Sequence, residues 1–182
     1  MKKIKNWHVY VITFLIVLVL GYQALGWFTD LKIKEQELSG YTVAYVSFSG
    51  SMLAYHRHVD KVENELESKN IKGIWEMSIY YNLYTDKRSG NKTNDAGIVV
   101  DPQDIAKLDK DSSVYKIMTI SAGKKMVINF PYKWAFSCMV GHIRWTKAMH
   151  EYLKLHNNEY ATVIELYNTQ DNIIYYITEL QK

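Results

Sequence analysis

The chain has 182 residues, of which 48% are hydrophobic and 23% charged, which suits one ordinary domain with a short extra segment and excludes a disordered chain. Its formal net charge is +3, but Lys2, Lys3 and Lys5 account for that excess, since 19 basic and 19 acidic residues follow them. A domain so balanced has no electrostatic footprint for nucleic acid, and no nucleic-acid partner is expected. The single cysteine, Cys138, cannot form an internal disulfide.

Residues 9–28 are predicted to form a transmembrane helix whose partner is the lipid bilayer. No Lys, Arg, Asp or Glu lies between Lys5 and Asp30, and twenty helical residues cover about 30 Å, the thickness of a hydrocarbon core. The preceding lysines place residues 1–8 in the cytoplasm by the positive-inside rule, so the rest of the chain is expected outside it, in the periplasm or extracellular space. Aromatic rings typical of the membrane interface lie near both ends: Trp7, Tyr10, Tyr22 and Trp27.

A cleaved signal peptide is the alternative for this segment. Its hydrophobic region would be Val9 to Leu20, and Ala24 with Gly26 would form a weak cleavage site. The uncleaved anchor is favoured because apolar character resumes at residues 25–28. Both interpretations export the domain.

Residues 29–40 are polar and are predicted to form a stalk that leads to a domain over residues 41–182. The alternation from Tyr41 to Phe48 predicts a strand. A helix should follow and end near Asn70, because four apolar residues recur at helical spacing: Tyr55, Val59, Val62 and Leu66. Two further strands are expected over residues 77–81 and 96–100.

The second half of the domain is predicted to have the same order of elements. Residues 114–120 form an expected edge strand, and strands at 126–130, 162–167 and 173–178 surround a helical stripe that runs from Trp145 to Leu155. The pattern over residues 134–140 fits either a strand or a helix, and the repeat favours a helix that begins near Ser137.

Two strand–helix–strand–strand repeats, at about 41–100 and 124–180, are therefore predicted. Their closest local match sets residues 79–82 against residues 165–168, and both segments end in Tyr-Asn. The predicted fold is α+β: two pseudo-symmetric repeats form an antiparallel sheet with two helices on one face, after one N-terminal transmembrane helix.

These motifs resemble the GyrI-like small-molecule-binding domain, which is also the effector-binding half of AraC-type and MerR-type regulators. The resemblance covers about residues 42–180, and its motifs occur in the expected order: Val43-Ala44-Tyr45-Val46 before Gly50, Ile79-Tyr80-Tyr81, Asn94-Asp95-Ala96-Gly97-Ile98 and Ile164-Glu165-Leu166-Tyr167. It implies an aromatic ligand cleft at the junction of the repeats, with a glutamate that maps onto Glu165. The chain departs from the pattern at Ser51-Met52, where an aromatic residue or a proline usually follows the first glycine. It departs again at Gly141-His142, where the second repeat of the family has a glycine–proline pair.

The predicted ligand-binding residues are Glu165, Tyr81, Tyr167 and Trp134. In a strand, Val163, Glu165 and Tyr167 share one face while Ile164 and Leu166 share the other. The apolar pair is expected to face the helices, which places Glu165 on the opposite face, and the repeat places Tyr81 opposite Tyr167. Without the resemblance, an exposed strand glutamate would be the simpler interpretation, and ordinary cross-strand packing explains Tyr81 equally well.

No metal or other cofactor is expected. His56 and His58 are two positions apart on a predicted helix, so their side chains point in nearly opposite directions and cannot share an ion. The sequence also contains no phosphate-binding loop, nucleophile elbow or dinucleotide fingerprint.

Three functions follow as hypotheses. The first is a membrane-anchored, extracytoplasmic domain that binds a small hydrophobic or cationic molecule at Glu165. The second is a hydrolase of reactive cyclopropane-bearing molecules, as some GyrI-like proteins are, with Glu165 as base and Tyr81 as hydrogen-bond donor. The third is a protein-interaction or inhibitor module. Ligand binding is favoured over catalysis.

Overall fold

A computed structural model describes residues 7–24, 26–49, 54–81, 93–133, 135–156 and 162–178 of the chain. Three helices, eight strands and a short 3-10 helix, η2 (Ile105–Lys107), make up this part. The elements are α1 (Trp7–Ala24), β1 (Lys34–Leu38), β2 (Tyr41–Ser49), α2 (Tyr55–Ser68), β3 (Gly73–Tyr81), β4 (Thr93–Val100), β5 (Lys116–Ile120), β6 (Gly123–Pro131), α3 (Ala135–His156), β7 (Thr162–Asn168) and β8 (Ile173–Thr178).

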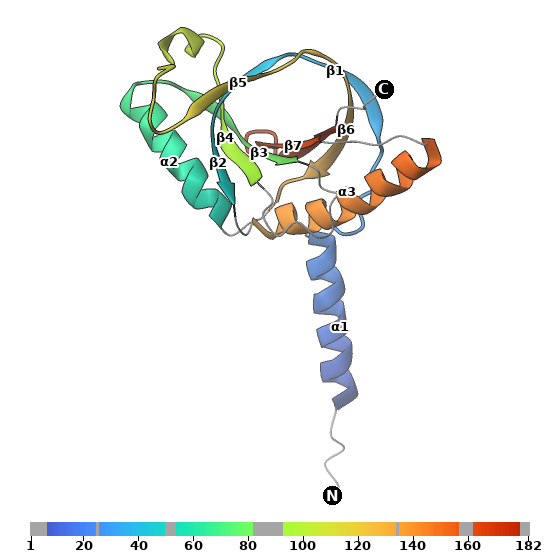
Figure 1. The fold of residues 1–182 in the computed structure, drawn as a ribbon. Helices are drawn as coiled ribbons and strands as arrows, with labels where there is room; N and C mark the ends of the chain where they lie inside the picture. The colour runs from blue at the N-terminus through green and yellow to red at the C-terminus, as the bar shows by residue number, and fades with distance from the viewer. Residues whose placement is uncertain are drawn as a thin grey trace, which may run out of the picture.

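Helix α1 extends away from the rest of the molecule (Figure 1). It has 18 residues, none of them buried, and it is long and apolar enough to cross a membrane. An N-terminal signal sequence has the same properties, so the orientation of the chain stays a prediction. The helix ends at Ala24, earlier than predicted, and the chain turns at Gly26, where φ is +80° and glycine is favoured.

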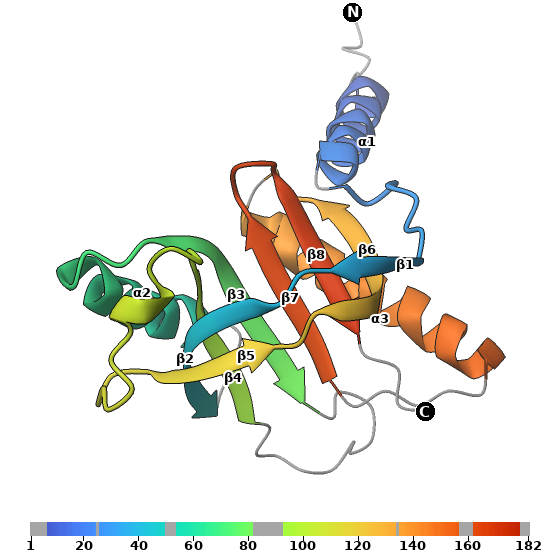
Figure 2. The same cartoon turned by 90° about the horizontal axis from the view of Figure 1, so that it is seen from above.

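The eight strands form one antiparallel sheet in the order β1-β6-β8-β7-β3-β4-β2-β5, which confirms the predicted α+β class. The sheet curls strongly, and α2 and α3 lie outside the curve (Figures 1 and 2). The order strand, helix, strand, strand occurs twice, as β2-α2-β3-β4 and as β6-α3-β7-β8. Strands β3 and β7 join the two groups at the middle of the sheet.

The predicted stalk is partly wrong, because residues 34–38 form strand β1 at the edge of the sheet. Lys34 pairs with Val127 and Leu38 with Gly123, so β1 is held by β6 through its backbone. Four of its five side chains are exposed. The sequence Lys-Glu-Gln-Glu-Leu therefore lacks the apolar alternation that predicts a strand.

Two hydrophobic clusters cover the two faces of the sheet. The helix-side cluster contains the buried face of α2, the inner face of α3 and the strand residues that point toward them, including Phe48, Tyr80, Ile98, Phe130, Tyr167 and Tyr176. The inner cluster lies on the other face, and its buried members are aliphatic or methionine: Val43, Met77, Ile79, Val99, Ile120, Val127, Ile164, Leu166 and Ile177.

Each helix packs by a stripe that its sequence encodes. Helix α2 buries the four apolar residues predicted to form its stripe and ends at Ser68, close to the predicted Asn70. Helix α3 buries Trp145 and Met149 completely. At Gly141 a Cβ atom would collide with the Tyr176 hydroxyl and with the Phe130 ring, so glycine is what allows α3 to lie so close to β6 and β8.

Candidate ligand site

Glu165 lies at the centre of the sheet, on β7, and its side chain is completely buried. Its neighbours Val163 and Tyr167 belong to the helix-side cluster, whereas Ile164 and Leu166 belong to the inner cluster. The prediction that Glu165 faces away from the helices is therefore wrong. Both faces of β7 are buried, so apolar residues alone could not show which face carries the helices.

The Glu165 carboxylate is bound by one group from α3 and one from its own strand. His142 Nδ1 lies 2.7 Å from Glu165 Oε1, and the Tyr167 hydroxyl donates a hydrogen bond to Oε2. The His142 side chain is 25% exposed, so it is the member of this group that solvent reaches. The carboxylate thus ties α3 to the central strands.

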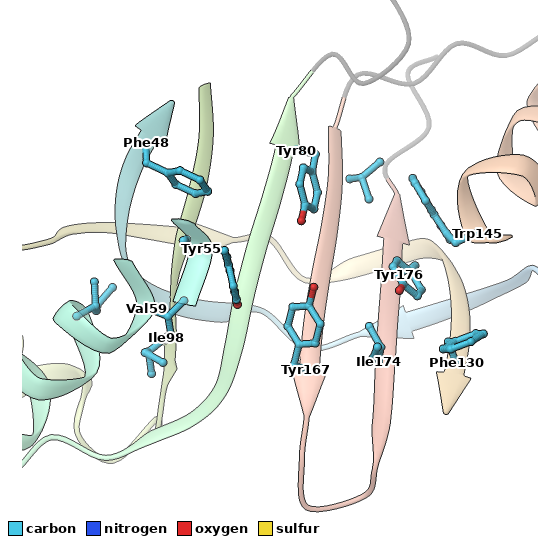
Figure 3. Packing of buried hydrophobic residues seen from close by; sticks show 14 of the residues in the cluster. Phe48, Tyr55, Val59, Tyr80, Ile98, Phe130, Trp145, Tyr167, Ile174 and Tyr176 are labelled. Carbon is cyan, nitrogen blue, oxygen red and sulfur yellow. The ribbon is translucent and has the colours of Figure 1, made fainter. Parts of the chain in front are cut away.

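Tyrosine hydroxyls surround this carboxylate. Those of Tyr80, from β3, and Tyr167, from β7, point toward one another (Figure 3). Burial, and next the charge of Glu165, raise the pKa values of Tyr80, Tyr167 and Tyr176 above their ordinary value. These hydroxyls therefore stay protonated and remain hydrogen-bond donors over the physiological pH range.

Tyr55 brings a further hydroxyl from α2. Its ring centre is 5.9 Å from that of Tyr167, and burial followed by the charge of Glu76 raises its pKa. The hydroxyl is buried and lies beside the Glu76 carboxyl, whose pKa burial raises and this hydroxyl partly lowers, but no hydrogen bond of normal geometry joins it to a described residue. Such a group costs about 1–3 kcal/mol unless something pairs with it.

Trp145 of α3 adds a second donor of this kind. Its indole stacks on the Tyr176 ring, with centres 5.5 Å apart, and its Nε1 also lacks a partner within the described part of the chain. The site therefore combines one completely buried carboxylate, aromatic walls and several buried polar groups that lack hydrogen bonds of normal geometry.

The site lies where the two strand–helix–strand–strand groups meet. Ser78 of β3 pairs with Glu165 across the β3–β7 boundary, and both are completely buried. Tyr55 and Tyr80 come from the first group, and His142 and Glu165 come from the second.

The structure brings together two of the four predicted site residues, Glu165 and Tyr167. Trp134 lies outside the described residues. Of Tyr81 only the backbone is described, and it pairs with Thr162, whereas Tyr167 pairs with Glu76, so the two tyrosines are not opposite one another. The preceding residue, Tyr80, contributes its ring to the site instead.

Sequence reasoning missed His142 and Tyr55. His142 stands out only as a departure from the glycine–proline pair of the resembled family, and Tyr55 only as the first residue of an amphipathic stripe. Neither signal points to Glu165, because a contact between a helix and a distant strand depends on the packing of the whole domain.

The described residues offer no metal centre beside Glu165. No group of three or more His, Cys, Asp or Glu side chains that could hold a metal ion occurs among them. Two surface cavities, of about 410 Å³ beside Asn70 and Gly73 and of about 140 Å³ beside Lys34 and Asn129, are not lined by Glu165.

Solved structures reveal the fold. No protein-family model and no curated protein sequence matches the chain. The crystal structure of the EcmrR C-terminal domain superposes with a TM-score of 0.59 at 11% identity, over 84% of this chain and 98% of that one. The chain therefore shares the fold of the EcmrR C-terminal domain.

A second EcmrR structure supports the same fold. The EcmrR chain in its cryo-EM complex with DNA gives a TM-score of 0.54 at 11% identity, over 97% of this chain and 68% of that one. A putative transcription regulation protein from Staphylococcus aureus gives 0.47 at 13% identity, over 84% and 100%, which is too low to support an argument. Identities this low establish the fold alone.

Proposed function

We propose that this protein is a membrane-anchored domain that binds a small hydrophobic or cationic molecule at Glu165, on the extracytoplasmic side of the membrane. The observation that carries the proposal is the completely buried Glu165 carboxylate between two helices, among tyrosine rings. The fold supports ligand binding, because the resemblance to effector-binding domains implies a ligand cleft. Helix α1 precedes this domain in the chain and would anchor it to the membrane.

A buried carboxylate is expensive to maintain. Removing an ionised group from water costs several kcal/mol even after the protein relaxes around it. A core built only for stability would use an apolar side chain here, as β7 does on its other face with Ile164 and Leu166. We infer that Glu165 is kept for recognition, with the surrounding rings supplying apolar contact area.

The contacts of Glu165 suggest how a ligand is held. An ionised carboxylate offers about four lone-pair positions, and His142 and Tyr167 take one on each oxygen. His142 occupies the position that a cationic or hydrogen-bond-donating ligand group would take, so we expect the ligand to displace or join His142. The Tyr55 hydroxyl would then donate to an acceptor on the same ligand.

We extend the proposal to the pseudo-symmetry of the domain. If the two groups of elements are repeats, Tyr80 and Tyr167 occupy equivalent positions, one on each side of the Ser78–Glu165 pair. The ligand would then lie near the pseudo-twofold axis, with one tyrosine from each half beside it.

A titration of the full chain in detergent tests this function. Tryptophan fluorescence is followed as lipophilic quaternary ammonium ions, and neutral molecules of the same shape, are added to wild type, Glu165→Gln and the exposed control Glu35→Gln. We expect Glu165→Gln to weaken binding of the cations at least about tenfold, which is 1.4 kcal/mol, and to spare the neutral analogues. Unchanged cation affinity in Glu165→Gln would reject the site.

Catalysis is the second candidate, favoured by the contact of one carboxylate with both a histidine and a tyrosine. In that case Glu165 removes a proton from water as the water oxygen attacks a strained cyclopropane carbon. A ring C–C bond breaks, and the carbon that keeps its electron pair takes the proton from Glu165. Turnover of such a compound that disappears in both Glu165→Gln and Tyr81→Phe would establish the predicted pair. Turnover lost in Tyr80→Phe but kept in Tyr81→Phe would transfer the donor role to Tyr80.

The third candidate, a protein-interaction or inhibitor module, depends on topology. A reporter fused to the C-terminus is expected to be active only outside the cytoplasm, which separates the domain from cytoplasmic partners. A cytoplasmic signal would remove the extracytoplasmic part of the proposal and leave the ligand site to be tested by titration.

A further inference from the structure

The outer face of α3 carries a stripe of exposed apolar side chains. Phe136, Met139 and Ile143 follow one another at helical spacing and are 67%, 52% and 53% exposed. The opposite face of the same helix buries Trp145 and Met149 against the sheet. Helix α3 therefore has an apolar inner face, and its first half has an apolar outer face as well. Within the described part of the chain, only the inner face has a partner.

The segment that follows α1 holds this stripe close to the end of the candidate membrane helix. Arg144 of α3 donates a hydrogen bond to the Gly26 carbonyl oxygen at 2.9 Å, and a Cβ atom at Gly26 would lie only 3.0 Å from the Phe130 ring. Two more exposed apolar residues, Trp27 and Phe28, lie at this junction. In both cartoon views the first half of α3 lies beside the C-terminal end of α1 (Figures 1 and 2).

The stripe becomes basic along the second half of α3. Lys147, His150 and Lys154 continue the same spacing and are exposed, and Glu151 is the one acidic residue among them. Neither lysine makes an ion pair with a described residue. An apolar stretch that continues into basic side chains is typical of a helix that lies in the interface of an anionic membrane.

We propose that the outer face of α3, formed by Phe136, Met139 and Ile143, lies in the headgroup region of the bilayer that α1 crosses, with Lys147 and Lys154 against anionic lipids. This proposal rests on the membrane placement of α1 in the proposed function. Interfacial helices bury their apolar face about 5–10 Å into the boundary between headgroups and acyl chains.

The position has a consequence for the ligand site. His142 lies next to Ile143 in α3 and contacts Glu165 from the inner side of the helix. A helix is about 10 Å across, so the buried carboxylate lies about one helix diameter from the lipid. Hydrophobic molecules dissolved in the bilayer would meet the domain at α3.

Fluorophore depth in vesicles tests the proposal on the full chain. Single cysteines are introduced at Phe136, Ile143, Val17 in α1 and the exposed Asp60 of α2, in a Cys138→Ser background, and labelled with bimane. The protein is reconstituted into vesicles of phosphatidylcholine and phosphatidylglycerol that carry a doxyl quencher close to the headgroups. A second set of proteins keeps Cys138 and controls for the effect of the Cys138→Ser change. Burial raises the pKa of the Cys138 thiol to about 12, so we expect the label to react slowly with Cys138.

We expect a blue shift and doxyl quenching at Phe136→Cys and Ile143→Cys, and the emission of a water-exposed probe at Asp60→Cys. Adding Lys147→Glu and Lys154→Glu should reduce quenching at Ile143→Cys in anionic vesicles. Emission at Phe136→Cys and Ile143→Cys that matches Asp60→Cys, while Val17→Cys reports lipid, would overturn this inference and leave the anchor intact.

Two other results would also overturn it. A water-exposed Val17→Cys probe would remove the anchor and this inference together. Probes on α3 could instead show a blue shift without doxyl quenching, and this shift could grow with the protein-to-lipid ratio. That result would assign the stripe to contact with a second copy of the chain.

Discussion

The two faces of strand β7 show how differently the two sides of the sheet are used. On the inner face, Ile164 and Leu166 join a cluster whose buried members are all aliphatic or methionine. On the helix-bearing face, Glu165 and Tyr167 join a cluster of rings and hydroxyls. Adjacent residues of β7 therefore belong to different environments. The inner face stabilises the curled sheet by aliphatic packing, and the helix-bearing face holds polar groups whose burial costs free energy.

This difference between the faces is the basis on which we propose the ligand site. Aliphatic packing gives stability without chemical selectivity, whereas a buried carboxylate with unpaired donors nearby reduces stability unless a ligand compensates. Perturbing the inner face should therefore change folding and leave binding per folded molecule alone, and perturbing the helix-bearing face should change both or only binding.

High pH should affect the helix-bearing face most strongly. Burial raises the pKa of four tyrosines there: Tyr55, Tyr80, Tyr167 and Tyr176. The charge of Glu165 is the next cause for all of them except Tyr55, for which it is the charge of Glu76. The folded state keeps protons that the unfolded chain releases near pH 10, so the free energy of unfolding is unaffected below about pH 10 and falls above it, by up to about 1.4 kcal/mol per pH unit for each tyrosine.

Urea denaturation at a series of pH values, with tyrosinate absorbance recorded in parallel, measures this loss. Tyr80→Phe should make the free energy of unfolding fall less steeply above pH 10, by the contribution of one tyrosine, about 1.4 kcal/mol per pH unit. Tyrosinate formation near pH 10 in a chain that stays folded would show that the hydroxyls are not buried together.

Leu166→Ala should have the next largest effect, by opening a cavity in the inner cluster. Leu166 is 1% exposed, and buried leucine-to-alanine changes cost about 2–5 kcal/mol of the free energy of unfolding. The exposed Leu155 of α3 is the control, because Leu155→Ala should change stability by less than about 0.5 kcal/mol. A change in ligand affinity per folded Leu166→Ala molecule would break the separation between the faces.

Tyr167→Phe should cost less stability but should also affect binding. It removes a hydrogen bond to a carboxylate, which contributes about 1.5–3 kcal/mol. Tyr175→Phe on the neighbouring strand is the matched control, because Tyr175 packs at the edge of the inner cluster. Equal losses in the two variants, by urea denaturation, would argue against a special role for the Glu165 contact.

Tyr55→Phe should have the smallest effect on folding and should have the opposite sign. It removes a buried hydroxyl that has no partner of normal geometry among the described residues, so the free energy of unfolding should rise by about 1 kcal/mol. Ligands that carry a hydrogen-bond acceptor should bind the variant more weakly. A destabilisation measured by urea denaturation would mean that the hydroxyl is already paired in the free protein.

Much of the fold could be predicted because its pattern is local. Apolar spacing located β2, α2, β5 and β8 within a few residues. Residues 135–140, whose pattern fitted either a strand or a helix, are helical. Strand β1 could not be found in this way, because its polar side chains are exposed and its backbone pairing with β6 depends on a partner about 90 residues away.

The candidate site was predictable in composition but not in geometry. The resemblance pointed to Glu165, whose role in ligand binding stays a prediction, and strand alternation correctly grouped it with Tyr167. The predicted face was wrong because β7 is apolar on both sides. Tyr81 was chosen rather than Tyr80 because the two repeats were aligned on their Tyr-Asn endings, and this alignment is shifted by one residue from the one that places equivalent side chains on the same face of the sheet. His142 reaches Glu165 only through the packing of α3, which no local pattern encodes.

A crystal structure of the protein with a bound lipophilic quaternary ammonium ion tests the central claim most directly. The account predicts density between α2 and α3, in contact with the Glu165 carboxylate and within hydrogen-bonding reach of Tyr55, with His142 moved or sharing the carboxylate. Density inside the curl of the sheet against Leu166 and Ile177, with the Glu165–His142 contact unchanged, would contradict it.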